Sequence, residues 1–284
     1  MDGIEAGRAR MQQLVRQALA AKGPIVFLTG AGISAESGIP TFRGPEGYWR
    51  IGSRNYHPQD LATHEAFEEM PEEVWAWYLY RRGVCRAAQP NDAHRALVRC
   101  EAAMGDRFLL VTQNVDGLHR RAGNSAERIY EVHGNTDYMR CEAEHPVVRP
   151  IPPDLPVDWP KDKKLDATER QLLGCTEHAR LHRPHVLWFD ESYDEPLFRL
   201  ESTMAAVADA AMLVVVGTSG STTLPALMVR SAARGGIPLV CINQDESPFT
   251  EEARNSARGL VILGAATVAV PALVDALGAD GGAS

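Results

Sequence analysis

The chain has 284 residues, of which 45% are hydrophobic and 23% are charged, and these values are typical of a folded protein that can bury a multi-stranded sheet. The formal net charge of −8 lacks the basic excess of nucleic-acid binders, and no apolar run is long enough to cross a bilayer. The five cysteines stand at scattered spacings, which argues against a disulfide framework and indicates a reducing cytoplasm. We expect a cytoplasmic monomer that binds neither nucleic acid nor a membrane.

Helical stretches and short apolar strands alternate along the chain. Residues 1–22 have the pattern of an amphipathic helix and not of a signal peptide. The clearest strands are residues 24–28, 108–112, 212–216, 238–242 and 260–263, and small or polar residues follow each of them. Such runs, separated by helices, predict a parallel sheet covered on both faces. Ligands of these sheets lie at the carboxyl ends of the strands, where the polar residues fall.

Two segments depart from this alternation. Residues 48–83 have the pattern of a helical insert. Residues 138–191 are rich in proline and charge and poor in apolar periodicity, so we expect a small inserted module stabilised by something other than a large core. The remaining residues, 1–47, 84–137 and 192–277, then form one discontinuous Rossmann-like domain, followed by a disordered tail at 278–284. The predicted fold class is α/β.

The first functional motif is the string GAGISAESGIPTFRG, which begins at Gly30 directly after a predicted strand. Glycines at this point let the backbone approach a pyrophosphate, and the helix that follows offers free N–H groups. A tight turn alone would explain two glycines. Phe42 and Arg43 add an aromatic face and a cation that a turn does not require, so the string predicts a dinucleotide site.

Polar or small residues at five other strand ends allow two interpretations each. Asn114 and Asp116 could hydrogen-bond a carboxamide such as that of nicotinamide, or could cap a helix. His133, in the string VHGN, is a candidate general base or a structural histidine. Residues 217–219, Asn243 and residues 264–266 could line the adenosine half of a dinucleotide or form ordinary turns.

These motifs, together with RPHVLWF at residues 183–189, resemble the sirtuins in their order and span residues 25–272. The resemblance implies a Rossmann-like NAD domain with helices on both faces of its parallel sheet, plus a small zinc module. It also implies NAD-dependent deacylation of acylated-lysine proteins or peptides, with release of nicotinamide and O-acyl-ADP-ribose. His133 would be the general base that activates the ribose hydroxyls, and Asn114 would be the second catalytic residue.

The same resemblance implies the contacts to NAD and to the peptide. The NAD-binding residues would be Gly30, Ala31, Gly32, Ala35, Glu36, Thr41, Phe42, Arg43, Trp49, Gln113, Asn114, Val115, Asp116, Gly217, Thr218, Ser219, Asn243, Gln244 and Ala266. The substrate peptide would pair with a strand over residues 186–189 and contact Val186, Trp188 and Phe189.

A second match concerns the acyl group. The string WYLYRR at residues 77–82 resembles the sirtuin subgroup that removes succinyl, malonyl and glutaryl groups, in which a Tyr-x-x-Arg pair reads the acyl carboxylate. Tyr78 and Arg81 fall in that register, and a helix would place them on one face. Ala62 stands where the subgroup carries a small residue that widens the pocket. We expect a desuccinylase or demalonylase with weaker deacetylase activity; the alternative is an ordinary surface helix.

The sequence departs from the sirtuin pattern at two places. Sirtuins usually bind zinc through two cysteine pairs, whereas here Cys141 and Cys175 are each followed by a histidine, His145 and His178. These four are the expected zinc ligands, with His182 as a spare; alternatively, the module has lost its metal. The second departure is Asp190, where the family usually has glycine, and it puts the geometry of peptide binding in doubt.

Two other functions remain open at this point. One is a protein ADP-ribosyltransferase or NAD glycohydrolase on the same fold, supported by Asp190 and the unusual module. The other is a sensor that binds NAD without turnover. His133, Asn114 and Asp116 argue against the sensor, because a binding module has no need of a catalytic base.

Overall fold

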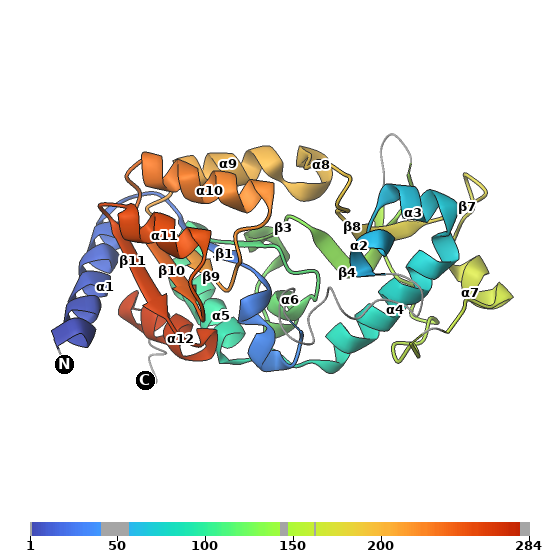
Figure 1. Cartoon of the computed structure of the whole chain (residues 1–284), viewed down its shortest axis with the longest axis horizontal. Coiled ribbons are helices and arrows are strands. Elements are labelled where there is room, and N and C mark those ends of the chain that lie inside the picture. Colours follow the sequence, from blue (N-terminus) through green and yellow to red (C-terminus); the bar gives the residue numbers. More distant parts are fainter. Residues whose placement is uncertain (1, 41–56, 143–146, 162, 279–284) are drawn as a thin grey trace.

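The computed structural model describes residues 2–40, 57–142, 147–161 and 163–278. Figure 1 shows two parts along the long axis of the molecule: a sheet flanked by helices, which holds both termini, and a smaller part built around α4 and β4. In these described ranges, no helix is both long and apolar enough to cross a membrane.

Within the described residues, the central sheet has six parallel strands in the order β11-β10-β9-β1-β2-β3. They are β1 (Ile25–Thr29), β2 (Phe108–Thr112), β3 (Ile129–Glu131), β9 (Met212–Val216), β10 (Leu239–Asn243) and β11 (Gly259–Leu263). Every residue of β1, β2 and β9 is buried. This agrees with the continuous apolar runs in the sequence, because a central parallel strand is covered on both faces.

Helices cover the two faces of this sheet. One face carries α1 (Asp2–Ala20), α5 (Asp92–Met104) and α12 (Ala266–Ala276), and the other carries α9 (Leu200–Ala208), α10 (Thr223–Arg234) and α11 (Pro248–Asn255). Side chains of one strand alternate between the faces. In β1, for example, Phe27 packs under the first set of helices and Leu28 under the second. The parallel sheet expected from the sequence is confirmed.

The predicted strands lie within one residue of the observed ones, but β3 was not predicted. It has only three residues and lies at the edge of the sheet, where Tyr130 and Glu131 are half-buried. A segment of this length has too few apolar positions to show either an alternating or a continuous apolar pattern.

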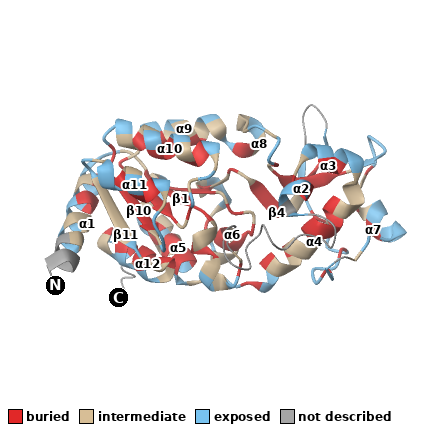
Figure 2. Cartoon of the chain, in the orientation of Figure 1, coloured by how far each residue is buried: buried red, intermediate tan, exposed pale blue. Residues whose placement is uncertain are grey.

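The second part combines the helical insert with the small module. It contains α2 (Pro58–Leu61), α3 (His64–Glu69), α4 (Pro71–Ala87), β4 (Gly134–Arg140), β5 (Val148–Pro150), β6 (Gly174–Cys175), α7 (Ala167–Leu172), β7 (Arg180–Leu181) and β8 (Arg183–Val186). The segments 48–83 and 138–191 enclose most of it, although α4 runs on to Ala87 and β4 begins at Gly134. Figure 2 shows buried residues along α4 and β4 as well as along the large sheet.

The small module does have an apolar core, and it shares that core with the helical insert. Trp75 and Leu79 of α4 pack in one cluster with Met139, Leu155 and Trp159. Several of its apolar residues, Ile151, Leu155 and Trp159, stand between prolines in irregular segments, so they follow no helical or strand period. That is why the sequence pattern did not reveal this core.

Candidate active site

A cavity of about 860 Å³ lies between the carboxyl ends of the large sheet and the second part of the molecule. Most predicted site residues line it: Gly30, Ala31, Gly32, Gln113, Asn114, Val115, Asp116, His133, Gly217, Thr218, Ser219, Asn243, Gln244 and Ala266 from the large sheet, and Ala62, Tyr78, Arg81, Val186, Trp188 and Phe189 from the second part. The residues expected to bind a dinucleotide and those expected to bind the acyl group therefore line the same cavity.

Two predicted NAD residues are absent from the described cavity wall, and four others cannot be placed. Thr41, Phe42, Arg43 and Trp49 lie outside the described residues. Ala35 and Glu36 form a short 3-10 helix away from the cavity wall. The Glu36 carboxylate accepts hydrogen bonds from the backbone N and Oγ1 of Thr267, at 3.2 and 2.8 Å, so it holds the start of α12.

The glycines after β1 have a packing role that the motif did not suggest. The Gly32 amide donates to the Gly217 carbonyl at 2.7 Å, and a Cβ on Gly32 would lie 2.6 Å from the Gly217 Cα. Gly217 itself has a φ of +62°, a conformation that favours glycine. The loops after β1 and β9 thus meet backbone to backbone, and only glycines allow this approach.

At the cavity wall, three polar side chains form a buried network. Ser34 Oγ donates to Asp116 Oδ2 at 2.8 Å, and Asn114 Nδ2 donates to Ser34 Oγ at 3.1 Å. Burial raises the pKa of Asp116, and the donors from Leu118 and Ser34 oppose this shift. The Leu118 amide donates to Asp116 Oδ1 at 2.8 Å, so Asp116 both caps α6 (Leu118–Ala122) and lines the cavity. The two interpretations of Asp116 are compatible.

The His133 imidazole has one nitrogen held in a fixed role. Nδ1 lies 3.0 Å from the backbone carbonyl of Gln113. Because a carbonyl only accepts, Nδ1 carries the proton and Nε2 has the free electron pair. Burial lowers the pKa of His133 to about 4, and the bond to Gln113 opposes this shift. The ring is therefore neutral near pH 7 and can accept a proton at Nε2.

Two further cavity residues, Tyr193 and Thr222, join this arrangement and were not predicted. Tyr193 Oη lies 2.7 Å from His133 Nε2. Thr222 Oγ1 donates to Gln113 Oε1 at 2.9 Å, and Gln113 Nε2 donates to Thr218 Oγ1 at 3.0 Å. Neither residue belongs to a recognisable motif, and Tyr193 lies 60 positions from His133 in the chain. No local sequence signal could have paired them.

The three predicted acyl-pocket residues come together in the second part. The Tyr78 side chain is only 2% exposed, and its hydroxyl accepts a hydrogen bond from Trp188 Nε1 at 2.9 Å. The Arg81 guanidinium lies over the Trp77 ring at 5.2 Å. Ala62, 3% exposed, completes this end of the cavity. A surface helix would expose its tyrosine, so this burial argues against that alternative.

The segment expected to pair with substrate is not a strand throughout. β8 ends at Val186, where the expected strand begins. The backbone amide of Leu187 donates to the His133 carbonyl and that of Phe189 to the Ala62 carbonyl, each at 3.0 Å. These are isolated bonds to loops rather than a ladder with a neighbouring strand. Phe189 itself is 54% exposed at the cavity.

Asp190, the departure from the sirtuin pattern, has a structural role. Its two carboxylate oxygens each lie 2.8 Å from the His64 backbone N–H, and one accepts from Glu65 N at 3.3 Å. These amides open α3, where a carboxylate is favourable. Among the described non-glycine residues, positive φ values occur at Ala179 and Arg199 and not at Asp190. The position therefore does not need the conformation that favours glycine.

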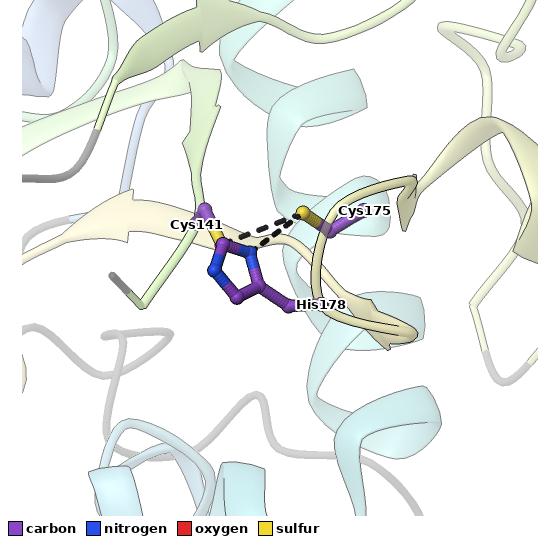
Figure 3. Close-up of side chains that lie close together, drawn as sticks. All are labelled: Cys141, Cys175 and His178. Carbon is purple, nitrogen blue, oxygen red and sulfur yellow. Dashed lines mark hydrogen bonds between the residues drawn. The ribbon is translucent and has the colours of Figure 1, made fainter.

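Three of the four expected zinc ligands lie close together, as Figure 3 shows. The Cys141 and Cys175 sulfurs are 3.5 Å apart, and His178 Nδ1 lies 3.1 and 3.3 Å from them. Ligands around tetrahedral zinc are separated by about 3.5–3.8 Å, so these atoms would have to move apart slightly to form one face of such a site, and thiolate and imidazole are the donors that zinc prefers. His145 lies outside the described residues. The spare candidate His182 is not in the group, since its Nδ1 bonds the Leu173 carbonyl.

Comparison with protein-family profiles decides the family. The profile described as the Sir2 family matches residues 30–223, which include the glycine string, His133 and the segment after β8. The chain belongs to the Sir2 family. This confirms the resemblance inferred from the motifs and the expectation of an NAD-dependent enzyme.

Curated Sir2 relatives align with most of the chain. An NAD-dependent protein deacylase of Leptospira interrogans is 40% identical over 234 residues, covering 80% of this chain and 83% of the relative. A Thermus thermophilus protein of the same name is 39% identical over 283 residues and covers 97% of both chains. The mitochondrial NAD-dependent protein deacylase sirtuin-5 of Danio rerio is 38% identical over 241 residues, covering 80% of this chain and 76% of the relative.

Solved Sir2 structures share the fold. A Sir2 homolog in complex with NAD has a TM-score of 0.73 at 33% identity and covers 93% of each chain. A mutant Sir2 homologue in complex with 2′-O-acetyl ADP ribose has a TM-score of 0.74 at 33% identity, covering 93% of this chain and 95% of the other. The predicted α/β fold is confirmed.

Proposed function

We propose that this Sir2 protein is an NAD-dependent protein-lysine deacylase that prefers succinyl and malonyl groups over acetyl groups. One observation carries the preference: Tyr78, Arg81 and Ala62 line the same cavity as His133. The names of the relatives support the coarser activity, since they are called NAD-dependent protein deacylases and one is a sirtuin-5.

The residues at the strand ends fit NAD. The loops after β1 and β9 present backbone at the cavity wall, as a pyrophosphate requires, while Asn114 and Asp116 are available for the carboxamide. When bound, NAD supplies the ribose carbon to which the acyl oxygen is transferred. His133 Nε2 accepts the proton of a ribose hydroxyl, because its electron pair is available at neutral pH. Water is the third reactant and releases the amine, so the products are the free lysine, nicotinamide and O-acyl-ADP-ribose.

The acyl end of the cavity suits a carboxylate. A guanidinium binds both oxygens of a carboxylate through paired N–H donors, and the Trp77 ring beneath Arg81 limits its motion. The Tyr78 hydroxyl lies one helical turn away on the same face of α4. A charge-assisted hydrogen bond contributes about 1.5–3 kcal/mol, which corresponds to roughly 10- to 150-fold in rate.

The test is the substitution Arg81→Met, assayed by mass spectrometry on matched acetyl, succinyl, malonyl and glutaryl peptides. Desuccinylation should fall by about tenfold to a hundredfold while deacetylation changes little, because only the acidic acyl group loses a partner. Arg86→Met is the control, since Arg86 is exposed on the same helix and pairs with Asp137. An equal loss of desuccinylation and deacetylation would refute the proposal that Arg81 binds the acyl carboxylate.

Asp190 does not support the alternative activities, protein ADP-ribosylation and NAD hydrolysis. Its carboxylate is bonded to the amides of α3 and does not line the cavity, so it offers no acceptor for ADP-ribose. The same peptide panel addresses the alternative of an ADP-ribosyltransferase or NAD glycohydrolase. Nicotinamide release at the full rate without any acyl peptide would favour that alternative over deacylation.

We also propose that Cys141, His145, Cys175 and His178 bind a structural zinc ion. The mutual approach of three of these side chains supports the proposal. The cytoplasmic location and the monomeric state stay predictions, and the absence of a disulfide among the five cysteines, all of them described, is compatible with a reducing compartment.

A further inference from the structure

Tyr193 occupies the one proton-accepting position of His133. The residue follows β8 in the chain and reaches the cavity beside the loop after β3. Its hydroxyl lies 2.7 Å from His133 Nε2, while Nδ1 of the same ring is held by the Gln113 carbonyl at 3.0 Å. The Gln113 bond leaves Nε2 without a proton, so Tyr193 is the donor in this contact.

An imidazole nitrogen of this kind has a single in-plane electron pair, so it accepts one good hydrogen bond at a time. In the proposed reaction, the ribose hydroxyl of NAD has to donate to the same electron pair. Tyr193 and the ribose hydroxyl therefore compete for one site.

We propose that Tyr193 is a positioning residue that orients His133 and covers its proton-accepting nitrogen until a ribose hydroxyl of NAD displaces it. This inference rests on the proposed role of His133 as the base. It adds a step to NAD binding: the Tyr193–His133 bond breaks, the ribose hydroxyl takes its position, and only then can a proton pass to Nε2.

The surroundings of Tyr193 favour a hydroxyl that can be displaced. Burial raises its pKa to about 12, so the hydroxyl keeps its proton and remains a donor. Thr222 and the backbone of Leu224, at the start of α10, act on the pKa of Tyr193 in the opposite direction, but burial has the larger effect. Because Tyr193 is half-buried and lines the cavity, its hydroxyl can bond to water when it leaves His133, which lowers the cost of displacement.

Other ionisable groups near His133 are engaged elsewhere. Asp116, after β2, accepts from Ser34 Oγ, and Glu131 of β3 pairs with Arg120. Glu191, in the loop after β8, pairs with Arg183 and accepts from the Trp188 amide. The pKa of His133 responds to burial and to the Gln113 carbonyl, with no charged neighbour among its causes. Changes at Tyr193 should therefore be visible in the titration of His133.

The experiment is Tyr193→Phe, which keeps the ring and removes the hydroxyl. A donor to Nε2 stabilises the neutral imidazole, so its removal should raise the pKa of His133, measured by NMR on histidine-labelled protein with His133→Ala for assignment. The same variant should bind NAD about fivefold more tightly by calorimetry, because the competitor is gone. Tyr80→Phe is the matched control, since Tyr80 is half-buried on α4 and absent from the cavity wall.

An unchanged pKa of His133, or an unchanged or weaker affinity for NAD, would overturn the inference. If Tyr193→Phe does not fold, Tyr193→Leu serves for the same two measurements. Neither measurement needs turnover. A protein that shows both effects but removes no acyl group would refute the proposed function and leave the competition at His133 intact.

Discussion

At the scale of single residues, His133 illustrates how surroundings decide a role. The string VHGN left it between a general base and a structural histidine. The Gln113 carbonyl determines which nitrogen carries the proton, and burial keeps the ring neutral. The Gln113 carbonyl and the groups that bury the ring come from outside the string. The motif therefore indicated which histidine is the candidate base, but not which tautomer it adopts.

The lowered pKa of His133 predicts the pH dependence of turnover. A base works in its unprotonated form, and a group with a pKa of about 4 stays unprotonated well below neutral pH. We therefore expect kcat/KM for NAD to be flat from pH 8 to about pH 6 and to fall only as the pH approaches 4. An acid limb at 6.5, the ordinary value for histidine, would contradict this. His133→Ala should remove turnover altogether while retaining NAD binding.

At the scale of elements, the strand ends of the large sheet were predictable, whereas the pairing of residues 186–189 with a substrate peptide stays a prediction. Apolar runs that end in Gly, Asn or Thr mark the carboxyl edge of a parallel sheet whatever else the protein contains. Residues 186–189 differ because a strand exists only where its backbone meets a partner strand. Their apolar character shows that they are buried or bind ligand, but not which hydrogen bonds they make.

Asp190 gives a prediction about α3. Asp190→Ala removes the carboxylate at the start of this helix and should lower the free energy of unfolding by about 1 kcal/mol. The Phe189 amide also donates to the Ala62 carbonyl, next to the bonds between Asp190 and α3. Loss of Asp190 should loosen this contact between expected substrate residues, so the KM for the acyl peptide should rise while NAD affinity is retained. Thermal unfolding, peptide kinetics and calorimetry would measure these effects.

Asp166→Ala is the control for this change, since Asp166 caps α7, another six-residue helix, whose residues do not line the cavity. It should cost similar stability and leave peptide kinetics unaffected. A rise in the peptide KM that is equal in both variants would mean that Asp190 acts only through general stability.

At the scale of the whole molecule, the site lies between two parts with different tasks. The large sheet brings the expected NAD residues to one edge, and the second part contributes Tyr78, Arg81 and Ala62. The three-residue Cys/His group lies in the second part. Metal binding there should therefore affect peptide and acyl recognition more than NAD binding.

This division predicts the effect of losing zinc. Cys175→Ala should abolish the zinc content measured by elemental analysis, because it removes one of three converging ligands. Affinity for the acyl peptide should fall while NAD affinity is largely kept. Cys100→Ala, a buried cysteine on α5, should keep its zinc. A purified wild-type protein without zinc would refute the metal proposal.

The sequence by itself determined the parallel sheet, five of its six described strands to within a residue, the family and more than half of the residues that line the cavity. These depend on local information, because apolar periodicity, strand-end glycines and motif order are all written along the chain. The proposed acyl pocket rested on the resemblance of residues 77–82 to one sirtuin subgroup, and helix geometry then placed Tyr78 and Arg81 on one face.

Only the tertiary structure decided the rest. The contact of Tyr193 with His133, the packing of Gly32 against Gly217 and the bond of Asp190 to α3 each join residues far apart in the chain. No periodicity or motif encodes such pairs, because which distant groups meet depends on how the sheet and the second part pack together. The hydrogen bonds and protonation states of the site depend on those contacts.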